Sequence, residues 1–411
     1  MLKKINLLSI YMFIFGLLST NYFLMIGGKS FVFFFEIGTI CIMLTFHSKI
    51  KIKSIDKVYV LMIVLSLFTL ISNLLYTNYT DQWNWQALAF FIIGVVAFFF
   101  YAIVYENKIE YIYAFWKGFK ISIFIQVIYG YLQYIASFFG GIDLNELLFR
   151  KITPHEGSLS HFYYGELVPS GFSWHPGTYA PLLVIGYWIF NDKIIIKLLI
   201  IGIAVLTKSS TCVLGILTCV IIDFVYANQL TKKKILKCFL IVLISVFIII
   251  STKIGNELVT EVEKLFNRIT TSATVSASYD MSSYYHKRYY TGVLKIVENA
   301  NVIQLFFGCG DGCSGYPFVK IFGQYKDNAP WAIESQIMSD LISKGLLGFG
   351  TLYYWIANIA IKGRKIDRRY MACIIALIVE SITYNIAFVW VILFEIILSI
   401  CVKKKTNIWR V

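Results

Sequence analysis

Residues 85–105 read WQALAFFIIGVVAFFFYAIVY, an apolar run without a single charged side chain. An α-helix rises about 1.5 Å per residue, so about 20 such residues cross the roughly 30 Å hydrocarbon core of a bilayer. The run therefore predicts a membrane-spanning helix.

The rest of the 411-residue chain repeats this pattern. It is 58% hydrophobic and 15% charged, with a mean hydropathy of +0.71, whereas soluble proteins carry a charge on about a quarter of their residues. The N-terminal run that begins MLKKINLLSI is too long for a cleaved signal peptide and is interpreted as the first span. Further spans are expected at about 30–46, 58–76, 85–105, 112–139, 174–190, 194–207, 209–226, 235–251, 336–361, 370–385 and 386–402. The sequence thus predicts an all-α polytopic membrane protein, a single membrane domain over residues 1–411 with about twelve transmembrane helices.

The distribution of basic residues predicts the orientation. Lys and Arg gather in alternate connecting segments: HSKIKIKSIDK (47–57), TKKK (231–234), KGRKIDRR (362–369) and KKK (403–405). The connection TNYTDQWN (77–84) has none. Because Lys and Arg favour the cytoplasmic side, both termini are expected in the cytoplasm. Two long outer loops follow, at 140–173 and, between the ninth and tenth spans, at 251–335.

The larger outer loop contains a predicted interfacial helix. In RYYTGVLKIVENANVIQLFFGCGDG, Tyr290, Val293, Leu294 and Val297 share one helical face, and Arg288 and Lys295 lie on the other. Tyrosines favour the headgroup region. Arg288 and Lys295 therefore either contact lipid phosphates or bind the phosphates of a lipid-linked substrate, for which arginine's planar fork is suited.

Two glycine- or histidine-rich stretches carry weaker signals. FFGCGDGCSG has no GK[ST] and no preceding strand, so it is interpreted as a flexible turn and not as a nucleotide-binding loop. Its Cys309 and Cys313 are equally compatible with a disulfide and with free thiols. In HEGSLSH (155–161) the histidines are six residues apart, so no metal site is expected.

Three ionisable residues lie where predicted spans meet the outer surface. Glu334 is either a general base or an acid favoured by a helix N-terminus. Lys208 lies at the turn of a hairpin over 194–226, as a functional cation or as a lysine that extends to water. His175, beside a proline at a helix start, is either structural or a donor to sugar.

In order and sidedness, these motifs resemble the superfamily of O-antigen polymerases and O-antigen ligases, bacterial inner-membrane glycosyltransferases. The matching stretches lie in residues 170–350: SGFSWHPGTYA, the turn TKSST, the arginine-led RYYTGVLKIVENANVIQLFFGCG, and Glu334–Ser335 followed by nine residues and GLLG. Ligases have histidine where this chain has Glu334, which favours a polymerase. The turn has Lys208 where arginine is common, which loses the bidentate geometry.

The resemblance implies transfer of a glycan from undecaprenyl pyrophosphate to the end sugar of another lipid-linked repeat unit, at the periplasmic face. Glu334 would be the base, and Arg288, Lys208 and Arg150 would stabilise the leaving pyrophosphate, with His175 and Lys295 as further substrate contacts. No cofactor, metal or nucleic acid is expected. The sequence leaves open whether a chain-length regulator is a partner.

Other classes remain as alternatives. A ligase would move finished glycan onto lipid A-core. A secondary transporter or lipid-glycan flippase would use Glu36, Glu380 and Glu395 inside the spans for ion coupling. A sensor whose outer loop only binds a ligand is a weaker alternative.

Overall fold

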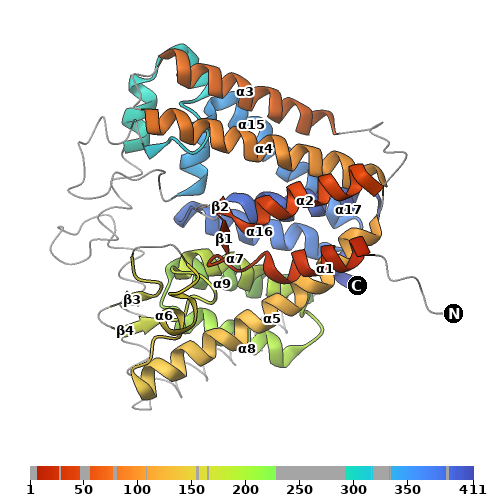
Figure 1. Ribbon diagram of the computed structural model, residues 1–411, viewed down its shortest axis with the longest axis vertical. Coiled ribbons are helices and arrows are strands. Elements are labelled where there is room, and N and C mark those ends of the chain that lie inside the picture. The colour runs from red at the N-terminus through yellow and green to blue at the C-terminus, as the bar shows by residue number, and fades with distance from the viewer. Residues whose placement is uncertain are drawn as a thin grey trace.

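The computed structural model in Figure 1 describes most of the chain. The described residues are 7–26, 29–46, 56–76, 81–107, 109–153, 157–163, 166–227, 292–315, 317, 333, 335–385 and 388–411. They are mostly helical, which confirms the predicted helical fold class.

Long helices coincide with the predicted spans. They are α1 (Leu7–Leu18), α2 (Phe31–Phe46), α3 (Lys57–Tyr76), α4 (Asp81–Asn107), α5 (Ile109–Gly140), α7 (Pro176–Ile189), α8 (Ile194–Leu206), α9 (Ser210–Ala227), α15 (Gln336–Arg364), α16 (Arg368–Thr383) and α17 (Phe388–Lys403). The predicted span 235–251 lies outside the described residues. The hairpin expected over 194–226 is confirmed as α8 and α9.

Short elements lie between the long helices. They are α6 (Leu144–Phe149), α13 (Val302–Phe307), the 3₁₀ turn η1 (Ile408–Arg410), and the strands β1 (Met25–Ile26), β2 (Lys29–Ser30), β3 (His161–Tyr163) and β4 (Glu166–Val168). β1 pairs antiparallel with β2, and β3 with β4, in register Tyr163 to Glu166.

Within the described residues, three helical stretches are long and apolar enough to cross a membrane: Lys57–Leu74, Trp85–Tyr105 and Ile109–Gly140. Shorter apolar helices accompany them. On α3 the large apolar side chains of Leu61, Phe68 and Leu74 are exposed, as a lipid-facing surface requires. Some of the described helices are therefore long and apolar enough to span a membrane, and the number of about twelve spans remains a prediction.

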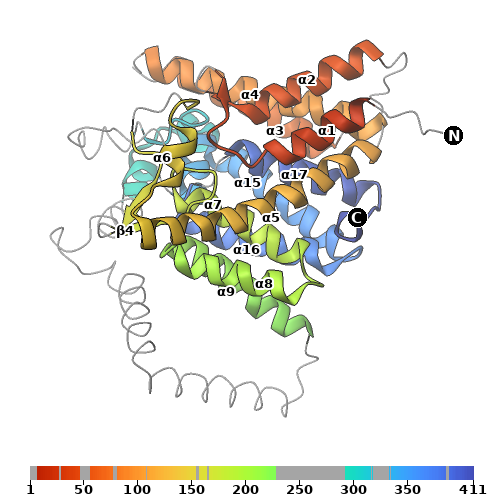
Figure 2. The ribbon, with the colours of Figure 1, turned by 60° about the horizontal axis from the view of Figure 1, so that its bottom comes forward.

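The bundle has two chemically different ends. Figures 1 and 2 place α6 and β4 at one end, together with the teal segment 292–315, and the C-terminus and the start of α1 at the other. We call the first the loop end and the second the basic end. At the basic end, Lys403 pairs with Asp56 at 2.7 Å, and Lys120 donates to the carbonyl of Val411 at 3.1 Å. Segments that the sequence assigned to one membrane face thus lie together, while which face is cytoplasmic remains a prediction.

Close helix contact is achieved by small residues. A Cβ on Gly16 of α1 would lie 1.9 Å from the carbonyl oxygen of Phe115, and one on Gly118 of α5 would lie 2.0 Å from that of Phe13. Membrane helices commonly pack through small residues because lipid supplies no hydrophobic force between them.

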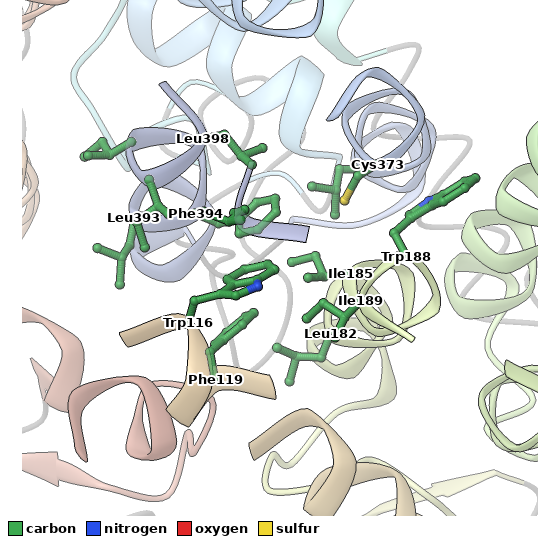
Figure 3. Packing of buried hydrophobic residues seen from close by; sticks show 14 of the residues in the cluster. Trp116, Phe119, Leu182, Ile185, Trp188, Ile189, Cys373, Leu393, Phe394 and Leu398 are labelled. Atoms are coloured by element: carbon green, nitrogen blue, oxygen red, sulfur yellow. The ribbon is translucent and has the colours of Figure 1, made fainter. Parts of the chain in front are cut away.

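The main core lies between α5, α7, α16 and α17 (Figure 3). Trp116 and Phe119 from α5 stack near Phe394 of α17, at ring-centroid distances of 6.1 and 6.4 Å. Trp188 of α7 and Cys373 of α16 are fully buried in the same cluster. This core fixes the helix ends that carry the functional candidates.

Candidate functional site at the loop end

Several polar side chains meet at the loop end from separate parts of the chain. The rings of His161 (β3) and His175 (start of α7) are in edge contact, with centroids 4.6 Å apart. His175 also stacks in parallel on Tyr384, which follows α16, at 4.8 Å. Lys208 pairs with Glu166 of the same β3–β4 hairpin at 2.5 Å. We call these five residues the histidine cluster.

The position of His175 follows from helix capping. Its Nδ1 accepts the backbone N–H of Gly177 at 2.9 Å, which makes it the N-cap of α7, and Pro176 occupies the first helical position. Nδ1 of His175 thus caps a helix, and a contact of its imidazole with sugar remains a prediction. Burial lowers the pKa of the neighbouring His161, so this imidazole is neutral near pH 7.

Lys208 lies in the turn between α8 and α9, as predicted. Its backbone has φ of 49°, a left-handed conformation that is uncommon outside glycine. The Lys208 side chain is 30% exposed and its partner Glu166 is 71% exposed. Exposed pairs of this kind contribute little to stability, so an anionic ligand can replace Glu166 at small cost.

Buried amides hold the segment that leads to His175. Gln133 of α5 accepts the backbone N–H of Gly171 at 3.0 Å, and Gln126 accepts that of Phe172 at 2.7 Å. Asn145 of α6 donates to the carbonyls of Leu159 at 2.9 Å and Ser173 at 3.2 Å. An unsatisfied buried polar group is costly, so these amides fix the path of the loop.

Arg150, a predicted phosphate contact, is the C-cap of α6, within the predicted outer loop 140–173. Its guanidinium forms a two-point ion pair with Glu146 at 2.6 Å and donates to the carbonyl of Gly157 at 2.9 Å. The hydrogen bonds from Arg150 to the Glu146 carboxylate lower the pKa of Glu146. The guanidinium of Arg150 thus ties α6 to the segment that begins at Gly157, and we assign Arg150 a positioning role.

Glu334 and Arg288 lie outside the described residues, but the neighbours of Glu334 are described. Ile333 and Ser335 are buried, and Ser335 is the N-cap of α15. The N–H of Gln336 donates to the carbonyl of Tyr384 at 3.3 Å. The start of α15 therefore lies against the residue on which His175 stacks.

Lys295 lies in a described helical stretch, residues 292–299, and is exposed. The protein-packed side of this stretch includes only part of the predicted apolar face, and whether the rest of that face contacts lipid remains a prediction. Val293 and Ile296 are buried, in a cluster with Ala87 and Ile342, while Leu294 is 65% exposed. Contacts with α4 and α15 determine the buried face, and the 3.6-residue pattern could not reveal them.

The glycine-rich stretch is not a flexible turn, which corrects the expectation from its sequence. Side chains of α3 and α4 hold its carbonyls: Thr69 bonds Phe307, Ser72 bonds Gly308, Asn73 bonds Cys309 and Gln86 bonds Gly312, at 2.7 to 3.1 Å. Gly308, Gly310 and Gly312 all have positive φ. Cys309 and Cys313 are both buried. The Cys309 thiol donates to the carbonyl of Cys313 at 3.7 Å, and the Cys313 thiol donates to the carbonyl of Asp311 at 3.6 Å.

Sequence reasoning missed a buried charged network beside this loop. Lys344 of α15 forms an ion pair with Asp311, and both are largely buried. One turn earlier, Asp340 accepts hydrogen bonds from Gln336 at 3.0 Å and Tyr353 at 3.3 Å. An ionisable residue inside a predicted span is a functional candidate by default. The rule applied to Lys208 would therefore also have selected Asp340 and Lys344.

Two cavities flank this network. One lies between α15, α16 and α17 and is lined by Gln336, Asp340 and Glu395 among others. The second lies between α3, α4 and α15, beside Asp311 and Lys344. Each has a free volume of about 70 Å³, and they share the walls Leu352, Trp355 and Ile392. Within the described residues, no group of three or more His, Cys, Asp or Glu side chains is arranged to hold a metal ion.

Comparisons with known proteins do not assign the chain to a family. No protein-family model matches the chain, and no curated protein matches it in sequence.

Proposed function

We propose that this protein is a polymerase of lipid-linked oligosaccharide repeat units, of O-antigen or capsule type, in a bacterial inner membrane. It would transfer glycan from undecaprenyl pyrophosphate to the end sugar of another lipid-linked unit. The observation that carries the proposal is the position of the histidine cluster. There Lys208 pairs with Glu166 of the hairpin that carries His161, and His161 contacts His175. Tyr384, on which His175 stacks, accepts a hydrogen bond from the start of α15, two residues after Glu334.

The chemistry needs two kinds of group. The acceptor hydroxyl oxygen attacks the anomeric carbon while the bond from that carbon to the pyrophosphate breaks. A base must take the hydroxyl proton, and Glu334 is the candidate. Cations must stabilise the leaving pyrophosphate, and Arg288 and Lys208 are the candidates. Lys295, exposed on its helix, is a further candidate contact for the substrate.

We expect Arg288→Ala and Glu334→Gln each to abolish long-chain glycan while leaving membrane insertion intact. Arg288→Ala removes a cation that would compensate the charge of the leaving pyrophosphate. In Glu334→Gln, the side-chain amide cannot accept the proton of the acceptor hydroxyl. The readout is glycan length on gels of cell extracts, in cells whose own copy of the gene is deleted, with protein amount measured in membranes. Normal chain length in both variants at normal protein level would contradict the site assignment.

His175→Asn separates capping from chemistry. Asparagine is a good N-cap, so we expect the thermal stability of the purified protein to change by less than about 1 kcal/mol. The stacked imidazole is lost, however, and glycan polymerisation should fall at least about tenfold, the size of effect typical of a lost catalytic contact. His175→Ala is the comparison, because it removes the cap as well. Full activity of His175→Asn would reduce His175 to a structural residue.

A ligase is the first alternative, and products distinguish it. Loss of a polymerase leaves single repeat units attached to the lipid core, whereas loss of a ligase leaves the core without glycan. Transport of glycan without elongation in reconstituted vesicles would favour the flippase alternative.

A further inference from the structure

Three glutamates are buried inside the helices, and the proposed transfer reaction uses none of them. Neither carboxyl oxygen of Glu36 (α2) or Glu380 (α16) has a hydrogen-bond partner among the described residues. In Glu395 (α17), the same is true of Oε2. Burying an unpaired charge is far more costly than burying a neutral acid. Ionisable residues inside membrane helices commonly mark ion or proton pathways.

Glu395 differs from the other two because it borders one of the two cavities described above. It is 4% exposed and lines the cavity between α15, α16 and α17. Gln336 and Asp340, in the first turns of α15, line the same cavity at its loop-end side, with Ser381 near the end of α16. The free volume of about 70 Å³ leaves room for water. Neither Glu36 nor Glu380 lines either of the two cavities described above.

Polar groups continue from Glu395 toward the basic end. Glu395, Ser399 and Lys403 are spaced i, i+4, i+8, so they share one face of α17. Ser399 is 2% exposed, and Lys403 pairs with Asp56. Lys403 Nζ lies 5.8 Å from the ring of Tyr101, a fully buried residue of α4. These polar side chains thus lie along one face of α17 between the cavity and the basic end.

We propose that Glu395 is a proton-binding site within a transmembrane proton path, which runs from the loop end through this cavity and along Ser399 to the basic end. The ligand is a proton and not a metal cation. A hard cation requires about six oxygen ligands, whereas the cavity beside Glu395 is walled mainly by apolar side chains such as Leu352, Trp355 and Ile392.

Other titratable groups lie on the helices packed around α17. They include Asp340 and Tyr353 on α15, Cys373 and Glu380 on α16, Tyr101 on α4 and Glu36 on α2. The Cys373 thiol is an electrostatic neighbour of Glu395. The step itself is only the binding and release of a proton at the carboxyl group. The proposal does not depend on the proposed glycan transfer.

Labelling with a hydrophobic carbodiimide tests the binding site. A protonated carboxyl gives its proton to a carbodiimide nitrogen, and its oxygen bonds the central carbon, after which the adduct rearranges to a stable N-acylurea. We treat the purified full-length protein with dicyclohexylcarbodiimide in detergent micelles and measure the modified peptides by mass spectrometry. Glu395 should react at least about tenfold faster than Glu36 and Glu380, which line neither of the two cavities described above and serve as internal controls. If the reagent reaches those two carboxyls only after a local opening of the fold, an opening free energy of about 1.4 kcal/mol accounts for that ratio.

The controls decide between outcomes. Glu395→Gln should lose the adduct, and Ser399→Ala should keep it. No labelling of Glu395, or equal rates at all three glutamates, would refute the site. Slower carbodiimide labelling of Glu395 in sodium chloride than in choline chloride, at constant pH, would assign the site to sodium and overturn the proton assignment.

Proton flux tests the path. In proteoliposomes that contain a pH-sensitive dye and carry a potassium diffusion potential, the wild-type protein should conduct protons, and Glu395→Gln should lower the rate at least about tenfold. Equal rates, or no flux through the wild-type protein, would refute the path. Neither experiment requires glycan transfer, so failure here is distinguishable from failure of the proposed function.

Discussion

Replacing Lys344 by alanine is expected to destabilise the protein by about 3–5 kcal/mol, the range for removing one partner of a buried ion pair. Lys344 of α15 pairs with Asp311 of the glycine-rich loop, and both are largely shielded from solvent. Alanine leaves the Asp311 carboxylate buried without its counter-charge. We expect a large loss of folded protein after detergent extraction and a lowered thermal midpoint, both measurable by fluorescence-detected size exclusion.

Two matched variants test that explanation. Lys208→Ala removes a lysine whose partner Glu166 is 71% exposed, so it should cost less than about 1 kcal/mol. The double variant Lys344→Met with Asp311→Leu removes both charges and should recover most of the lost stability. A double variant no more stable than Lys344→Ala would show that packing, and not the unpaired charge, causes the loss.

The positions of the helices could be predicted from the sequence, because an apolar run long enough to cross a bilayer has few other folded states. The position of Lys208 at a tight turn followed from the same reasoning, because the apolar run 194–226 is too long for one helix. The N-capping of α7 was visible in the His175–Pro176 pair. These features are local, and local patterns are what a single sequence records.

The ion pair between Arg150 and Glu146, one helical turn earlier, is also local, and the i, i+4 spacing of these two residues was the available signal. Contacts between distant segments could not be predicted in the same way. Asp311 and Lys344 are separated by 33 residues, and no pattern joins them. The pinned glycine-rich loop likewise depends on hydroxyl and amide groups of α3 and α4, such as Thr69 and Asn73.

These long-range contacts meet where α15 is kinked. Gly345 has φ of 62° and ψ of −176°, a backbone conformation almost restricted to glycine. It lies directly against Gly308 of the glycine-rich loop: a Cβ on Gly345 would be 2.5 Å from the backbone nitrogen of Gly308. The kink thus allows the loop to bond α15 through Cys309 N–H to Ile342 O at 3.0 Å and Gly310 N–H to Ser343 O at 3.1 Å.

Gly345→Ala should therefore cost roughly 3 kcal/mol or more, since a strained conformation adds to a clash between two backbones. The thermal midpoint of the purified protein measures the loss. Gly350→Ala, on the same helix with nothing within 4 Å of its Cβ, is the control and should be neutral or stabilising by up to about 1 kcal/mol. The kink orients the first turns of α15, which begin beside the histidine cluster. On the proposed function, the remaining folded Gly345→Ala protein should therefore also polymerise glycan poorly. A stable Gly345→Ala protein of normal activity would show that neither the kink nor its contact with the loop is required.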